Sequence, residues 1–111
     1  MGRSTTLLHP QSAKALAVLG GTIRAQRVLR GMTQQQVADW FGYSRDTVRS
    51  IEAGDQGVSI GRVFNVAVHV GVPLFGMDAE ELHRAAHDTT RLTALLPQRV
   101  VPAADEVDDD F

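Results

Sequence analysis

The sequence predicts an all-α fold, in which one small domain of five helices is followed by a short C-terminal extension. Apolar residues recur at three- and four-residue spacing along most of the chain. Capping residues and glycines interrupt that pattern at intervals typical of short helices. With 111 residues, the chain has room for one compact core. The only segment resembling a strand is 99–101, which could pair across a dimer.

The first helix is expected to run from Ser12 to a stop at Gly31. Its apolar positions recur at Leu16, Leu19 and Ile23, and its more polar side carries Arg24, Arg27 and Arg30. The pair Gly20-Gly21 should weaken the middle of this helix by about 1 kcal/mol per glycine relative to alanine.

Two short helices joined by a tight turn are expected next. Thr33 is a good N-cap and forms a capping-box pattern with Gln36, which predicts a helix from Gln34 to Phe41. Gly42 turns the chain because glycine accepts positive φ. Ser44 then caps a second helix that ends near Ala53, with Thr47 at the N3 position and Asp46 in the first turn.

Two further helices complete the predicted domain and begin its extension. Ser59 opens a helix that ends at Val70, before Gly71 and Pro73. Asp78 caps another helix over 79–87, and the segment 89–96 either continues it or forms a separate turn. The apolar stripe of the fourth helix comprises Val63, Val66, Ala67 and Val70. A second stripe, expected to support dimerisation or a larger core, comprises Leu74, Phe75, Leu82, Ala86, Leu92, Leu95 and Leu96.

These elements divide the chain into four expected parts. Residues 1–11 lack apolar periodicity and contain Pro10, so they form a flexible arm, and residues 12–76 form the folded domain. Residues 77–101 form a helical extension for dimer or partner contact, and residues 102–111 form a disordered acidic tail. The first 76 residues have an excess of four positive charges and the rest an excess of six negative charges, although the whole chain carries only −2.

The two short helices and their turn have the layout of a helix-turn-helix. Val48 and Ile51 turn the second helix toward the core. The outward side of that helix then carries Arg45, Asp46, Arg49 and Ser50. Such a face can enter the DNA major groove, where arginine reads guanine edges and polar side chains read other bases.

The residues around this motif resemble the Xre, Cro and phage-repressor type of DNA-binding domain. The similarity covers about residues 19–75 and is carried by the pattern TQxxVAxxxGYSRxTVRxIExG over 33–54, preceded by IRxxR over 23–27. Tyr43 departs from the family, which more often has valine there. The resemblance implies a homodimer on a palindromic operator in double-stranded DNA, with half-sites about 34 Å apart.

The same resemblance implies roles for individual residues. Gln34 would touch a base or phosphate near the half-site edge, beside the base-reading residues of the second helix. Arg27 and Glu52 would form a pair that orients the arginine toward phosphate, although a surface pair worth ~0–1 kcal/mol is the plainer interpretation. The expected phosphate contacts are Arg24, Arg27, Thr33, Ser44 and Thr47.

A narrower similarity extends beyond the motif. The patterns ExGDxxVSxGxxFxV over 52–66 and LTxLLPxRV over 92–100 resemble Hip-type antitoxins. Such repressors control their own operon and restrain a HipA-like kinase toxin. The resemblance therefore implies a type II toxin–antitoxin pair, with a stand-alone regulator and a protein-interaction adaptor on the same fold as the alternatives.

Composition argues against other classes of protein. The chain has no cysteine, no glycine-rich phosphate loop and no nucleophile elbow, so we expect no enzyme, no catalytic residues and no cofactor. His83 and His87 stand four apart without a third metal ligand, which favours a solvated or dimer-facing pair. We expect a cytoplasmic protein without a membrane segment. The acidic tail, which ends at Phe111, is either a solubilising end, a hook for a partner, or a mimic of DNA that competes for the basic face.

Overall fold

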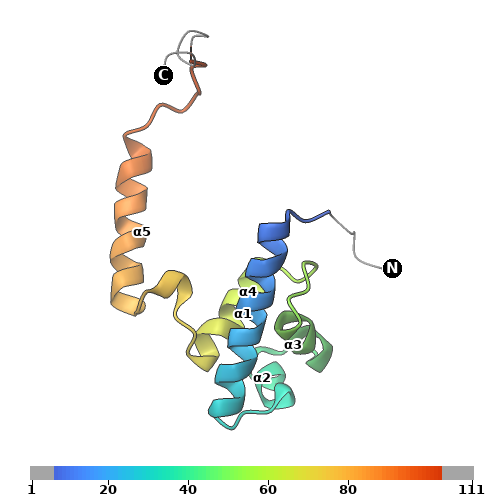
Figure 1. Cartoon of the computed structure of the whole chain (residues 1–111). Coiled ribbons are helices and arrows are strands. Elements are labelled where there is room, and N and C mark those ends of the chain that lie inside the picture. The colour runs from blue at the N-terminus through green and yellow to red at the C-terminus, as the bar shows by residue number, and fades with distance from the viewer. Residues whose placement is uncertain (1–6, 104–111) are drawn as a thin grey trace. The chain divides into compact units, whose positions relative to one another are not determined.

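A computed structural model describes residues 7–103 of the chain. Its helices are α1 (Pro10–Leu29), α2 (Gln34–Phe41), α3 (Arg45–Glu52), α4 (Ile60–Val70), the short 3₁₀ helix η1 (Leu74–Gly76) and α5 (Ala79–Ala94) (Figure 1). The described residues contain no strand, and the predicted all-α fold with five helices is confirmed. The chain divides after Met77 into two units, of which the first holds α1 to η1 and the second holds α5.

The first helix begins at Pro10, two residues earlier than expected, so Pro10 and Gln11 do not belong to an arm. Proline is well tolerated at the first helical position, because the amide hydrogen that it lacks would have no partner within the helix. The ring of His9 accepts a hydrogen bond from the Gln11 amide at 3.2 Å and caps this end. The part of the expected arm before residue 7 lies outside the described residues.

The second and third helices begin and end where the capping residues predict. The Thr33 hydroxyl accepts from the Gln36 amide, while the Gln36 side chain accepts from the Thr33 amide, which makes a complete capping box. Gly42 follows α2 with a φ of 73°, a conformation that an L-residue with a side chain rarely adopts. Ser44 then caps α3 through the Thr47 amide at 3.1 Å. These local bonds fix the turn of the helix-turn-helix.

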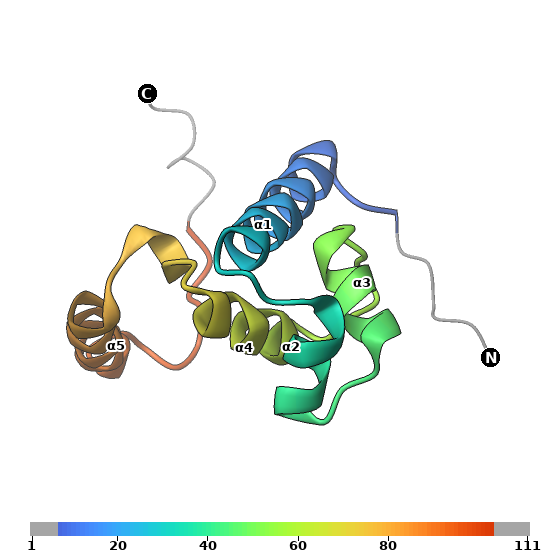
Figure 2. The same cartoon turned by 90° about the horizontal axis from the view of Figure 1, so that it is seen from below.

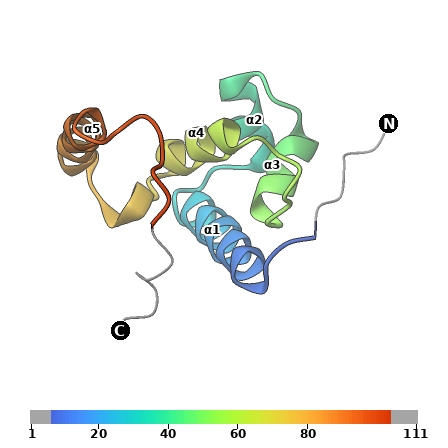
Figure 3. The same cartoon turned by 90° about the horizontal axis from the view of Figure 1, so that it is seen from above.

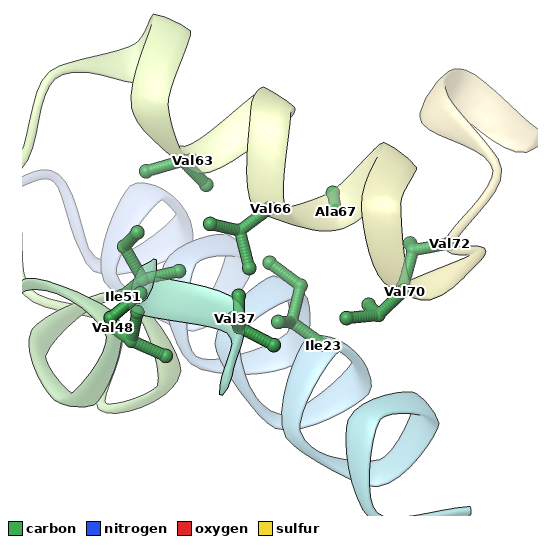
Figure 4. Close-up of a cluster of buried hydrophobic side chains, with 10 residues drawn as sticks. Ile23, Val37, Val48, Ile51, Val63, Val66, Ala67, Val70 and Val72 are labelled. Atoms are coloured by element: carbon green, nitrogen blue, oxygen red, sulfur yellow. The ribbon is translucent and has the colours of Figure 1, made fainter. Parts of the chain in front are cut away.

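The core of the first unit lies where α1, α2, α3 and α4 meet (Figure 4). The predicted stripe of α4 is buried at all four positions, and it faces Ile23 of α1 and Val37 of α2. Val48 and Ile51 attach α3 to the same cluster. Burying a side chain of this size contributes roughly 1.5–3 kcal/mol, so the packing of these apolar stripes holds the short helices in place.

Gly20 is a contact point between α1 and the end of α3. The sequence alone did not predict this contact. A Cβ built on Gly20 would lie 2.6 Å from the Ile51 carbonyl oxygen and 2.7 Å from that of Glu52. The neighbouring Gly21 has open space around it. Glycine at position 20 therefore allows the two helices to approach closely, which outweighs its poor helix propensity.

The second unit contains α5, a single helix that continues through 89–94. Asp78 caps it as predicted, and a capping box with Glu81 is complete. None of the residues of α5 is fully buried. Leu92 in the helix, and Leu95 and Leu96 directly after it, expose more than half of their surface. The apolar side of α5 is thus not covered within its own unit.

Candidate nucleic-acid interface

The third helix presents two different sides. Val48, Ile51 and Glu52 are buried, whereas Arg45, Asp46 and Arg49 are exposed and Ser50 is half-buried. Contacts with α1 and α2 hold the buried side, and α3 lies at the edge of the unit when the chain is seen from below and above (Figures 2 and 3). The four residues predicted to read bases therefore share the open side of one helix.

The charges on this open side are arranged unequally. Arg49 contacts Asp46 one turn earlier, with 3.2 Å between Nη2 and Oδ1, while both side chains remain largely exposed at 61% and 81%. An exposed pair of this kind is worth little in water and opens easily. Arg45, at the first position of the helix, makes no ion pair within residues 7–103. Both guanidinium groups are therefore available to an external acceptor.

A hollow of about 680 Å³ lies on one side of α3 and is rich in arginine. Arg24 and Arg27 of α1 line it together with Arg45 of α3, and no carboxylate does. Its remaining lining consists of Val28, Met32, Thr33, Gln34 and Gln35. The structure thus gathers five residues that the sequence assigned to DNA contact, and places them around one space that favours an anion.

A second hollow of about 470 Å³ lies on the other side of α3. Four of its residues come from the start and open side of α3, namely Ser44, Asp46, Thr47 and Ser50. The rest come from the loop before α4 and from its first turn, namely Gly57, Val58, Ser59 and Arg62. The open side of α3 is therefore a ridge between two polar hollows, a shape that suits a double helix with phosphates on either side of a groove.

Arg27 and Glu52 form the predicted pair, but it is buried rather than at the surface. The residues are 8% and 9% exposed, and the arginine Nε lies 2.5 Å from Glu52 Oε2 while its Nη2 donates to Oε1 at 3.0 Å. Nη1 donates to the Met32 carbonyl at 2.8 Å. Because each guanidinium nitrogen already has an acceptor, a phosphate contact from Arg27 must use a remaining hydrogen of Nη1 or Nη2, and it stays a prediction.

Gln34 belongs to the same network. Its side-chain nitrogen donates to Glu52 Oε1 at 3.1 Å, so the carboxylate at the end of α3 joins the start of α2 to α1. The amide oxygen of Gln34 accepts no hydrogen bond within residues 7–103, and the residue is half-buried beside Arg45 in the arginine-rich hollow. The Arg27–Glu52 pair, together with its bond to Gln34, therefore fixes the angles between α1, α2 and α3, the helices that carry the proposed contacts.

The hydroxyl groups expected to hold phosphate have local partners. Thr33 and Ser44 accept from backbone amides at the starts of α2 and α3, and the hydroxyls of Ser44 and Thr47 lie 3.0 Å apart. Each hydroxyl oxygen keeps further hydrogen-bonding capacity. Among residues 7–103, no group of three or more histidine, aspartate or glutamate side chains is placed to hold a metal ion.

Comparison with known proteins bears on this surface. Residues 18–85, more than half of the chain, match a family described as "Helix-turn-helix domain". The chain belongs to this helix-turn-helix family. It is accordingly a DNA-binding regulator. Neither the curated proteins nor the solved structures gave a match.

The helix-turn-helix surface contains one further cation, Arg62, which the sequence pattern did not predict. Arg62 is the third residue of α4 and lines the second hollow. Its guanidinium carbon lies 5.2 Å from the centre of the Tyr43 ring, which also stacks on Phe41. The Tyr43 hydroxyl accepts a hydrogen bond from the Asn65 side chain at 3.0 Å. A positive charge in the first turn of a helix is unfavourable, because the N-terminal end of the helix dipole is itself positive. The position of Arg62 in the sequence could therefore have indicated that it binds an external anion.

No helix among residues 7–103 has both the length and the apolar content that crossing a membrane requires.

Proposed function

We propose that the protein recognises a specific DNA sequence by placing α3 in the major groove. The observation that carries this proposal is the open side of α3, where two exposed arginines stand between two polar hollows. Arg45, Asp46, Arg49 and Ser50 read base edges, and Gln34 reaches the edge of the half-site. An arginine that donates two hydrogen bonds to guanine discriminates by roughly 1–3 kcal/mol against the wrong base.

Residues around the hollows hold the sugar–phosphate backbone in this proposal. Arg24 supplies an exposed charge on one side of α3 and Arg62 on the other, while Arg27 contributes from the floor of its hollow. Thr33, Ser44 and Thr47 offer hydroxyl groups at the starts of α2 and α3. These contacts release counterions, so they give affinity that falls with salt but carries no sequence information.

A matched set of variants tests the two kinds of contact. Arg49→Ala should lose about five- to 150-fold in affinity for the operator and much less for scrambled DNA, because it removes a base contact. Arg24→Ala should weaken binding to both DNAs alike and reduce the salt slope by about 1. Arg84→Ala, which removes an exposed arginine of α5, serves as the control. Equal losses on both DNAs for Arg49→Ala would reject its base-reading role.

The regulator acts as a homodimer on a palindromic operator and represses transcription in this proposal. The uncovered apolar side of α5 supports the dimer, since a 16-residue helix without a packing partner has little stability of its own. A two-fold dimer would place its half-sites about 34 Å apart. Sedimentation equilibrium with and without operator DNA gives the stoichiometry, and one chain bound per palindrome would contradict the dimer.

We further propose that the protein is the antitoxin of a type II toxin–antitoxin pair and neutralises a HipA-like kinase. The support is the similarity of 52–66 and 92–100 to Hip-type antitoxins. Co-expression with the product of the neighbouring gene should yield a stable complex in which kinase activity is suppressed. A neighbour without a kinase-like sequence, or two products that purify separately, would instead favour a stand-alone regulator.

A further inference from the structure

The arginine-rich hollow beside α3 has an excess of positive charge that the folded unit does not neutralise. Glu52 balances Arg27, but Arg24 and Arg45 make no ion pair within residues 7–103. No aspartate or glutamate lines the hollow. The two exposed guanidinium groups therefore face about 680 Å³ of open space in which an anionic group would be attracted.

The chain itself contains a segment of opposite charge. Five of the six residues from 105 to 110 are acidic, and they precede the terminal Phe111. These five residues make the net charge of the chain negative, because the rest of the chain has eleven lysines and arginines but only eight acidic residues. The acidic segment and the basic hollow thus complement each other in charge.

The acidic segment is joined to α5 by a stretch of chain without regular secondary structure. The helix α5 ends at Ala94, and residues 97–103 form no helix or strand. Ten residues, 95–104, separate α5 from the acidic segment and span up to about 35 Å when extended. A connection of this length gives the acidic segment a wide range of positions relative to α5.

We propose that residues 105–111 of the same chain bind the hollow lined by Arg24, Arg27 and Arg45 and compete there with DNA phosphate. This inference rests on the proposed function, because it assigns a competitor to the same surface. Each exposed ion pair is weak, but tethering gives the segment an effective concentration of the order of millimolar. The competition should therefore reduce DNA affinity by about three- to tenfold at low salt and fade as salt rises.

The first experiment tests the contact without DNA. Backbone amide spectra of the full chain are compared with those of Asp109→Asn/Asp110→Asn at low salt. The double variant Glu80→Gln/Asp88→Asn changes the net charge equally on α5 and is the control. We expect changes at Arg24, Arg45 and residues 33–35 for the tail variant only, independent of protein concentration. Unchanged signals there, or changes that grow with concentration as for docking between two chains, would overturn the proposal.

The second experiment measures DNA affinity for the same three proteins over a range of salt concentrations. The tail variant should bind three- to tenfold more tightly than the wild type at low salt, and the control should gain less than half of that. Equal gains for both variants would show an effect of net charge alone and overturn the proposal. If no protein binds DNA but the amide shifts appear, the intramolecular contact stands and the proposed function fails.

Discussion

The adjacent glycines of α1 give the sharpest prediction about the fold, because the same substitution should stabilise at one position and fail to stabilise at the other. Gly20→Ala adds a methyl group 2.6 Å from the Ile51 carbonyl oxygen and 2.7 Å from that of Glu52. Gly21→Ala adds the same group in open space, one residue further along the same helix. Both substitutions gain the same helix propensity, so their difference isolates the contact between α1 and α3.

The magnitude follows from two opposing contributions. Replacing glycine by alanine inside a helix stabilises by about 1 kcal/mol, which is the whole expected effect of Gly21→Ala. At Gly20 the neighbours are backbone atoms that cannot rotate away, and overpacking of this kind costs about 1–3 kcal/mol. The two variants should thus differ by 1–3 kcal/mol, and since each kcal/mol moves Tm by about 4–8 °C in a domain of this size, by at least about 4 °C in Tm.

Thermal and urea unfolding, followed by circular dichroism at 222 nm, measure the difference directly. We expect Gly21→Ala to unfold above the wild type and Gly20→Ala to unfold below Gly21→Ala by at least that amount. Two variants of equal Tm would refute the reasoning, since α1 would then have room to shift without cost. Because the contact also sets the position of α3, Gly20→Ala should weaken operator binding while Gly21→Ala leaves it unchanged.

Further predictions concern the capping residues and the buried pair. Ser44→Ala removes the cap of α3 and should cost about 1 kcal/mol, whereas Ser59→Ala, at a position whose side chain makes no capping bond, should cost only a few tenths, as measured by urea unfolding. Glu52→Ala leaves Arg27 buried without its carboxylate and should destabilise by about 3–5 kcal/mol. The double variant Arg27→Met/Glu52→Ala should cost less than the sum of the single changes, and additive costs in a double-mutant cycle would argue against the pair.

Much of the fold was predictable from the sequence because it depends on local chemistry. Thr33, Ser44 and Asp78 cap their helices as predicted, since a short polar side chain beside free backbone amides leaves few alternatives. The stripe of α4 is buried because its spacing matches one side of a helix. The placement of the proposed base-reading side chains around α3 follows from the same periodicity.

The features that could not be predicted depend on contacts between distant segments. Arg27 can be buried only because Glu52 and the Met32 carbonyl accept hydrogen bonds from its guanidinium group. The i,i+3 pattern of arginines in α1 instead placed Arg27 on the polar side of that helix. Gly20 was expected only to weaken α1, because the pattern of one helix does not show that α3 packs closely against it. Arg62 reaches the interface through its stacking on Tyr43, from another helix.

The central claim, that the open side of α3 enters the major groove, has a direct measurement. The chain contains no cysteine, so Ser50→Cys provides one thiol on that side for a photoactivatable cross-linker. With the DNA upstream of its own gene, the account predicts cross-links to major-groove base edges at two positions about one helical turn apart, suppressed by excess unlabelled operator. Bound DNA that gives no cross-link from position 50, or cross-links scattered evenly along the duplex, would contradict it.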